Sequence, residues 1–72
     1  MRGAILVLML CAATAHADPA AKAHALNAQG KKHLKAKDYV AALEAFEEAY
    51  DIYPSAGLLV NIGTTYQQMG KT

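Results

Sequence analysis

Two stretches of the chain repeat one pattern, and this repeat decides the fold. The first is Leu26-Asn27-Ala28-Gln29-Gly30-Lys31-Lys32-His33, and the second is Leu59-Val60-Asn61-Ile62-Gly63-Thr64-Thr65-Tyr66. The same offset of 33 residues separates Leu26 from Leu59 and Gly30 from Gly63. A glycine in the middle of a helix costs about 1 kcal/mol relative to alanine. The two glycines therefore predict close contact with a neighbouring helix.

Apolar residues recur every three to four positions around this repeat, which indicates amphipathic helices. We expect helices over about 19–37, 39–53 and 56–69. Each is preceded by a residue that can cap it, namely Asp18, Asp38 and Ser55. Pro54 is expected to end the second helix and Gly70 the third. Because the turns are very short, neighbouring helices are expected to pack antiparallel.

The first 17 residues have the layout of a secretory signal peptide. A positive start at Arg2 is followed by the apolar run 4–13 and by small residues at Ala15 and Ala17. We expect cleavage between Ala17 and Asp18, which makes 1–17 a signal peptide and 18–72 the mature chain.

The residues of this segment disfavour two other interpretations. An uncleaved membrane anchor needs roughly 20 apolar residues, and the run is too short for that. A lipoprotein signal would use Cys11, but the bulky Leu10 before it disfavours that cleavage.

The repeat and the residues between its two copies resemble the tetratricopeptide repeat family. Ala42-x-x-x-Phe46, Ala49 and Pro54 stand between the copies, as in the pattern of that family. The resemblance covers residues 23–70, with a full repeat at about 23–55 and half a repeat at about 56–72. It implies an all-α fold: an antiparallel helix-turn-helix hairpin plus a third helix, the start of a right-handed superhelix.

The resemblance also assigns packing roles, with small residues where helices approach and large ones beside them. The repeat-packing residues are Leu26, Gly30, Ala42, Phe46, Ala49, Pro54, Leu59, Gly63 and Tyr66. His33 and Gln29 depart from the usual residue types at their positions. Since half a repeat lacks its second helix, we expect an open edge on helix 56–69 that is available for self-association.

Composition and motif spacing disfavour several functions. The formal net charge is only +1, which excludes a strongly basic nucleic-acid-binding arm. His24 and His33 lie nine residues apart, on opposite sides of a helix, so they cannot share a metal ion. Thr65 replaces the first glycine that a phosphate-binding loop ending in Gly70-Lys71-Thr72 would need. We therefore expect no catalytic residue, metal, cofactor or nucleic acid, and no membrane span after signal cleavage.

In arrays of the family that the chain resembles, the first helices of successive repeats line a concave groove that holds extended peptides. Carried over, the peptide-binding candidates are Asn27, Lys31, Lys35, Asn61 and Thr64. The wider groove-facing set adds His24, Leu34, Val60, Gln67 and Gln68. A clamp for two carboxylates is not supported, because it needs a lysine and an asparagine where this chain has Asn27 and Lys31.

These observations lead to one functional hypothesis and one alternative. The first is an exported adaptor or scaffold, periplasmic or secreted, that binds a protein or peptide without catalytic activity. The alternative is the truncated N-terminal docking arm of a larger cell-envelope enzyme or assembly factor.

Overall fold

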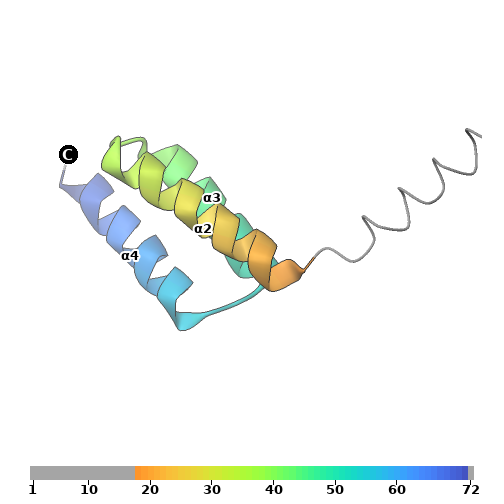
Figure 1. Ribbon diagram of the computed structural model, residues 1–72. Helices are drawn as coiled ribbons and strands as arrows, with labels where there is room; N and C mark the ends of the chain where they lie inside the picture. The colour runs from red at the N-terminus through yellow and green to blue at the C-terminus, as the bar shows by residue number, and fades with distance from the viewer. Residues whose placement is uncertain (1–17, 72) are drawn as a thin grey trace, which may run out of the picture.

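The computed structural model describes residues 18–71 and contains three helices in that range (Figure 1). They are α2 (Pro19–Lys35), α3 (Tyr39–Ile52) and α4 (Ala56–Gly70). The prediction of an all-α fold built from a helical hairpin and a third helix is confirmed. The predicted signal peptide, with Ala17 at its expected cleavage site, lies outside the described residues.

Each helix begins where a side-chain oxygen accepts a hydrogen bond from a backbone N–H of the first turn. The bonds join Asp18 to Ala20 (3.1 Å), Asp38 to Ala41 (3.4 Å) and Ser55 to Leu58 (3.3 Å). Such caps satisfy N–H groups that have no partner inside the helix. Short polar residues therefore set the start of all three helices in this part of the chain.

The end of α2 differs from the sequence prediction by two residues. The helix ends at Lys35 rather than at 37, because Lys37 adopts a left-handed conformation with φ 64°. The Lys37 N–H donates to the carbonyl of Leu34 (3.0 Å), and the Asp38 N–H donates to that of His33 (2.9 Å). This pair of bonds is the Schellman motif, in which glycine usually holds the left-handed position.

The other two ends differ from expectation by one residue, which is within the normal uncertainty of helix boundaries. Helix α3 ends at Ile52, and α4 continues through Gly70.

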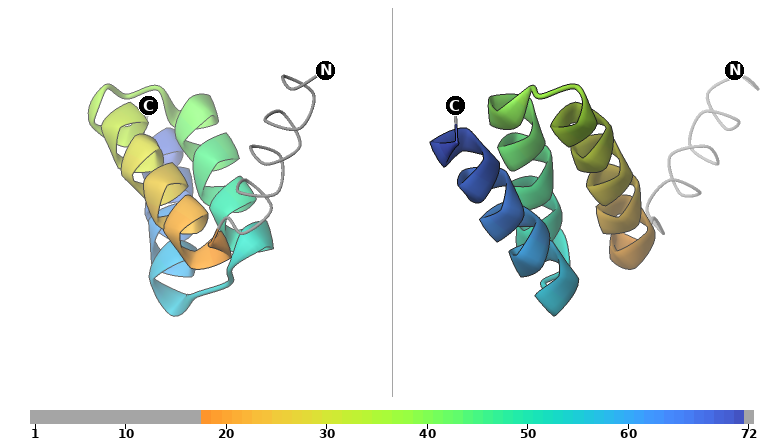
Figure 2. Two further views of the ribbon diagram at one scale, coloured as in Figure 1. Left: turned by 45° about the vertical axis from the view of Figure 1, so that its right-hand side comes forward. Right: turned by 90° about the vertical axis from the view of Figure 1, so that its left-hand side faces the viewer.

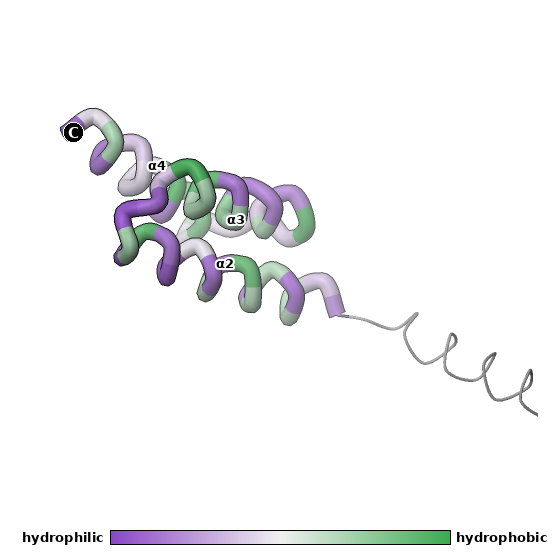
Figure 3. Tube along the Cα trace, turned by 90° about the horizontal axis from the view of Figure 1, so that it is seen from above, coloured by the Kyte–Doolittle hydropathy of each residue, from purple (hydrophilic) through white to green (hydrophobic). Residues whose placement is uncertain are grey.

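Helix α3 is the central element and packs against both other helices (Figure 2). Its chain direction is opposite to that of α2 and α4, so these two run roughly parallel. The core consists of Ala23, Ala42, Phe46, Ala49 and Leu58, with Leu26, Leu34, Tyr50, Ile52 and Ile62 partly buried around it. Polar and apolar segments alternate along each helix, as amphipathic packing requires (Figure 3).

The two glycines of the repeat lie in different surroundings. A Cβ atom placed on Gly30 would be 2.6 Å from Cδ1 of the Phe46 ring, so the ring packs directly on the backbone of α2. A Cβ placed on Gly63 would meet nothing within 4 Å. Leu59 and Tyr66, on the same face of α4, are each 53% exposed. The packing expected at these three positions of α4 therefore has no counterpart among residues 18–71.

The sequence analysis also missed one buried polar residue, Thr65, which is fully buried on α4. Its hydroxyl donates to the backbone carbonyl of Asn61 at 2.7 Å. This bond within the helix satisfies the hydroxyl, so Thr65 can lie in an apolar interior at low cost. Pro54, assigned to packing in the sequence analysis, is exposed in the turn before α4.

Candidate functional site

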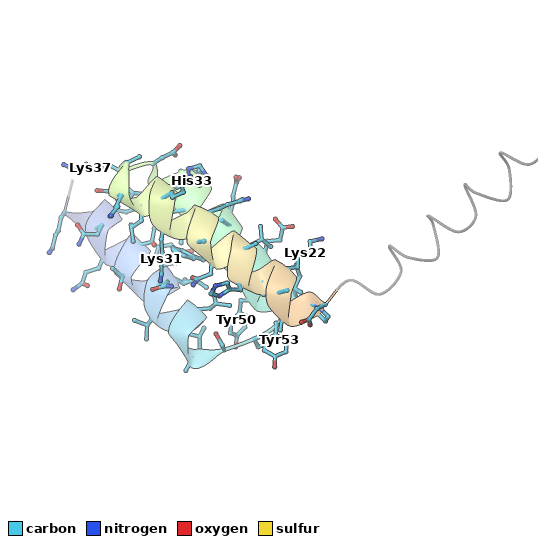
Figure 4. The ribbon with its side chains drawn as sticks, in the orientation of Figure 1. Lys22, Lys31, His33, Lys37, Tyr50 and Tyr53 are labelled. Atoms are coloured by element: carbon cyan, nitrogen blue, oxygen red, sulfur yellow. The ribbon has the colours of Figure 1, made fainter. Side chains whose placement is uncertain are left out.

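A groove runs between α2 and α4, and it has two connected portions. The first, near the start of both helices, is lined by residues that include Ala20, His24, Asn27, Tyr53, Val60 and Asn61. The second, near their ends, is lined by Leu34, Lys35, Lys37, Tyr39, Thr64 and Gln68. Lys31 lines both portions, and Figure 4 shows its side chain between the two helices. We call this surface the α2–α4 groove.

The structure places all five peptide-binding candidates on this groove. Asn27 and Asn61 line the first portion, Lys35 and Thr64 line the second, and Lys31 belongs to both. The third helix folds back antiparallel to α3 and so runs beside α2, which brings these residues together from distant positions in the chain. Their role in binding stays a prediction.

A hydrogen bond joins the two walls of the groove. The Asn61 side-chain amide donates to the Asn27 side-chain oxygen at 2.7 Å, across 34 residues of sequence. An asparagine amide has two N–H donors and an oxygen that accepts twice. The Asn27 amide nitrogen and the Asn61 amide oxygen thus keep a full donor and a full acceptor for a molecule lying in the groove. A polypeptide backbone offers the matching pair of groups.

Several lining residues lie outside the predicted sets, and three of them carry a long polar or aromatic side chain: Lys37, Tyr39 and Tyr53. Tyr53 follows the last residue of α3 and is 52% exposed in the first portion. Lys37 belongs to the other turn and Tyr39 is the first residue of α3, and both line the second portion. Turn residues escape a periodicity analysis, since their direction depends on the turn and not on the helical repeat.

Four residues of the wider groove-facing set also line the groove. His24 and Val60 line the first portion, whereas Leu34 and Gln68 line the second. Gln67 is exposed and is not among the residues that line the two portions, so its place on the groove stays a prediction. It lies one residue before Gln68, and on a helix adjacent residues project about 100° apart.

Residues 18–71 contain no cluster of three His, Cys, Asp or Glu side chains that could hold a metal ion. No helix in the same range is long and apolar enough to cross a membrane. Every buried polar side chain in residues 18–71 has a hydrogen-bond partner. The groove is therefore the main feature of this part of the chain on which a functional assignment can rest.

Comparison with models of protein families gives one match to this helical pair. Residues 23–56 match the family model of the tetratricopeptide repeat. No curated protein and no solved structure gives a match to the chain. The matched residues span most of α2, all of α3 and the turn into α4, which is the helical pair whose glycine and phenylalanine pack together.

Residues 23–56 thus carry a tetratricopeptide repeat. This repeat is a protein-interaction module, so the partner class that it indicates is another protein.

Proposed function

We propose that the chain is an exported adaptor that holds an extended peptide segment of another protein in the α2–α4 groove and catalyses no reaction. The observation that carries the proposal is the hydrogen-bonded asparagine pair, Asn27 and Asn61, in the first portion of the groove. Its remaining donor and acceptor suit the N–H and C=O groups that every peptide segment presents. Main-chain bonds of this kind give affinity without requiring one particular side chain.

Apolar contacts in the groove support the same proposal. Val60 is 65% exposed and Tyr53 is 52% exposed, and both line the first portion. Each apolar square ångström that a ligand covers contributes roughly 25 cal/mol. A peptide side chain lying between these residues would therefore add affinity to the main-chain bonds.

Export is proposed from the sequence of residues 1–17. A cut between Ala17 and Asp18 would leave the cap of α2 intact, because Asp18 remains on the mature chain and accepts the Ala20 N–H. Periplasmic or secreted localisation follows from this proposal. Replacing Ala17 with leucine should block cleavage, since the peptidase accepts only small residues there. An unchanged mature mass for Ala17→Leu would contradict the proposed site.

Site-specific crosslinking tests peptide binding in the groove. The photoreactive residue p-benzoylphenylalanine replaces Val60 in the groove, and in a matched control it replaces Glu48 on the exposed face of α3. After irradiation in the producing cells, mass spectrometry identifies the captured segment. We expect a discrete adduct with one peptide segment at position 60 and not at 48. Equal capture of peptides at positions 60 and 48, or no capture at position 60, would contradict the proposal.

The exposed face of α4 supports a second candidate, self-association. Leu59 and Tyr66 are half exposed, and the space beside Gly63 is open within residues 18–71. We propose that two copies cover this face by packing their α4 helices together. Sedimentation equilibrium should then show a dimer that Tyr66→Lys converts to a monomer. A monomeric starting chain would exclude this candidate.

The same face also fits the alternative that the chain is a docking arm of a larger cell-envelope enzyme or assembly factor. In that case a following helix would cover Leu59, Gly63 and Tyr66. Reading the coding sequence beyond Thr72 decides this: a continuing helix with the Ala-x-x-x-Phe spacing favours the docking arm.

A further inference from the structure

We infer that the ligand of the α2–α4 groove is a bipartite peptide segment, with apolar residues at the Tyr53 end and acidic residues at the Lys37 end. The inference rests on the proposed function and adds the chemistry of the partner. It is carried by the distribution of charge along the groove, which differs sharply from the balanced charge of residues 18–71.

The charged side chains that line the groove are all basic. Lys31, Lys35 and Lys37 follow one another along its second portion, and no carboxylate lines either portion. Helix α4, the opposite wall, carries no Asp, Glu, Lys or Arg between Ala56 and Gly70. The groove therefore has a positive end with no compensating acid across it.

The acids of the described chain lie elsewhere. Asp18 and Asp38 cap α2 and α3, while Glu44, Glu47, Glu48 and Asp51 are exposed on α3. Six lysines balance these six acids in residues 18–71, yet this range contains no ion pair. The groove lysines are thus available to an incoming carboxylate.

Helix dipoles act in the opposite direction but are weaker. Both α2 and α4 end near the second portion, and each C-terminus carries roughly half a negative charge. Three full positive charges outweigh these partial charges. The remaining field attracts acidic ligands and weakens with added salt, because the groove is open to solvent.

The backbone at Lys37 supports the assignment independently. Lys37 holds a left-handed conformation that glycine adopts without strain, and the equivalent position of the second copy, 33 residues later, is Gly70. A lysine at this position is unfavourable for the turn but lines the groove. Binding of an anionic group is a reason for a lysine here that folding does not provide.

The first portion has a different character. Its walls carry Ala20, Tyr53 and Val60, and the one lysine among its lining residues is Lys31, which it shares with the second portion. Since α2 and α4 run in the same direction, the groove has an apolar start and a basic end. A peptide with its apolar and acidic residues in one order should therefore bind better than the reverse.

Binding of four labelled probe peptides to the chain, followed by fluorescence anisotropy, tests the inference. The first joins a Leu/Tyr block to a Glu/Asp block. The others replace the acids with Lys, replace the acids with Gly/Ser, or replace the apolar block with Gly/Ser. We expect the first to bind about tenfold more tightly than the neutral probe, as three exposed ion pairs allow. That advantage should disappear at high salt. Equal affinity for the acidic and Lys probes would overturn the inference.

Two matched lysine variants test whether the groove lysines cause the preference for the acidic probe. Lys35→Gln should weaken the acidic probe about threefold, as loss of one exposed pair predicts, and should leave the neutral probe unchanged. Lys32→Gln removes the same charge from an exposed residue of α2 that does not line the groove, so it should have little effect. Equal losses for the two variants would assign the binding to net charge and overturn the inference.

The variant Lys37→Gly tests whether Lys37 contributes to ligand binding or to stability. Glycine relieves the left-handed strain, so the urea midpoint should rise while affinity for the acidic probe falls. A higher midpoint with unchanged affinity would remove Lys37 from the binding surface and contradict the inference.

Two further outcomes distinguish a failure of the charge inference from a failure of the proposed peptide binding. If crosslinking at position 60 captures a peptide but the acidic and neutral probes bind equally, the charge inference falls and the proposed function stands. If neither assay detects a ligand, both fall. Vesicles of anionic phosphatidylglycerol form another arm: binding that depends on Lys35, with no probe bound, would assign the lysines to a lipid surface.

Discussion

The α2–α3 hairpin and helix α4 carry the same repeat pattern, but its residues are packed in the hairpin and largely exposed on α4. Gly30 packs beneath the fully buried ring of Phe46, whereas Gly63, its equivalent, faces open space among residues 18–71. Leu26 packs against the core, whereas Leu59 is half exposed. The comparison teaches that the pattern marks a surface prepared for a partner helix. The environment of each residue depends on whether that helix is present.

Truncating Phe46 should have the largest effect, because its ring fills the space between α2 and α3. Phe46→Ala removes a fully buried side chain, which typically costs about 3–5 kcal/mol. A domain of this size rarely has more stability than that. We expect the helical circular dichroism signal at 222 nm to be largely lost in buffer. A cooperative urea transition at the original midpoint would contradict the packing described here.

The adjacent pair Leu58 and Leu59 tests the difference between the two faces of α4. Leu58→Ala removes a buried side chain and should cost about 2–5 kcal/mol, whereas Leu59→Ala removes a half-exposed one and should cost less than about 1 kcal/mol. Urea unfolding of both variants measures this. Similar losses for the two would show that Leu59 is covered in solution.

Gly30→Ala should destabilise the hairpin although alanine favours helix. The added methyl group would overlap the Phe46 ring, which is fully buried and cannot move aside without disturbing α3. Overpacking costs about 1–3 kcal/mol, which exceeds the gain of about 1 kcal/mol in helix propensity. A lower urea midpoint is expected. A higher one would mean that the ring is displaced in solution.

Gly63→Ala is the matched substitution and should have the opposite sign. With nothing within 4 Å of the new methyl group, only the propensity gain of about 1 kcal/mol remains. The urea midpoint of the isolated chain should therefore rise slightly. Destabilisation would instead indicate that another helix, from a second copy or a partner, packs closely on this face.

Much of the fold could be predicted from the sequence, because its determinants are local. The three caps, the helix periodicity and Pro54 act within a few residues, and they placed every helix to within two residues. The predicted end of α2 lies two residues beyond the observed one, because lysine is unusual in the left-handed position that ends the helix. No residue type in the sequence signals that conformation.

The groove was only partly predictable. Family resemblance named Asn27, Lys31, Lys35, Asn61 and Thr64, and all five line the groove. Tyr53 and Lys37 were missed, since the direction of a turn residue depends on how the next helix packs. Gln68, and not its neighbour Gln67, lines the second portion, because adjacent residues of a helix project about 100° apart.

The sequence alone determined the helices, their order and the repeat, because capping, periodicity and turn chemistry are local properties. Tertiary structure decided which copies of the pattern are buried. It also joined Asn27 to Asn61 across 34 residues and gathered three lysines opposite an uncharged helix. These features depend on α4 folding back beside α2, and burial and charge balance at a groove are properties of both walls together.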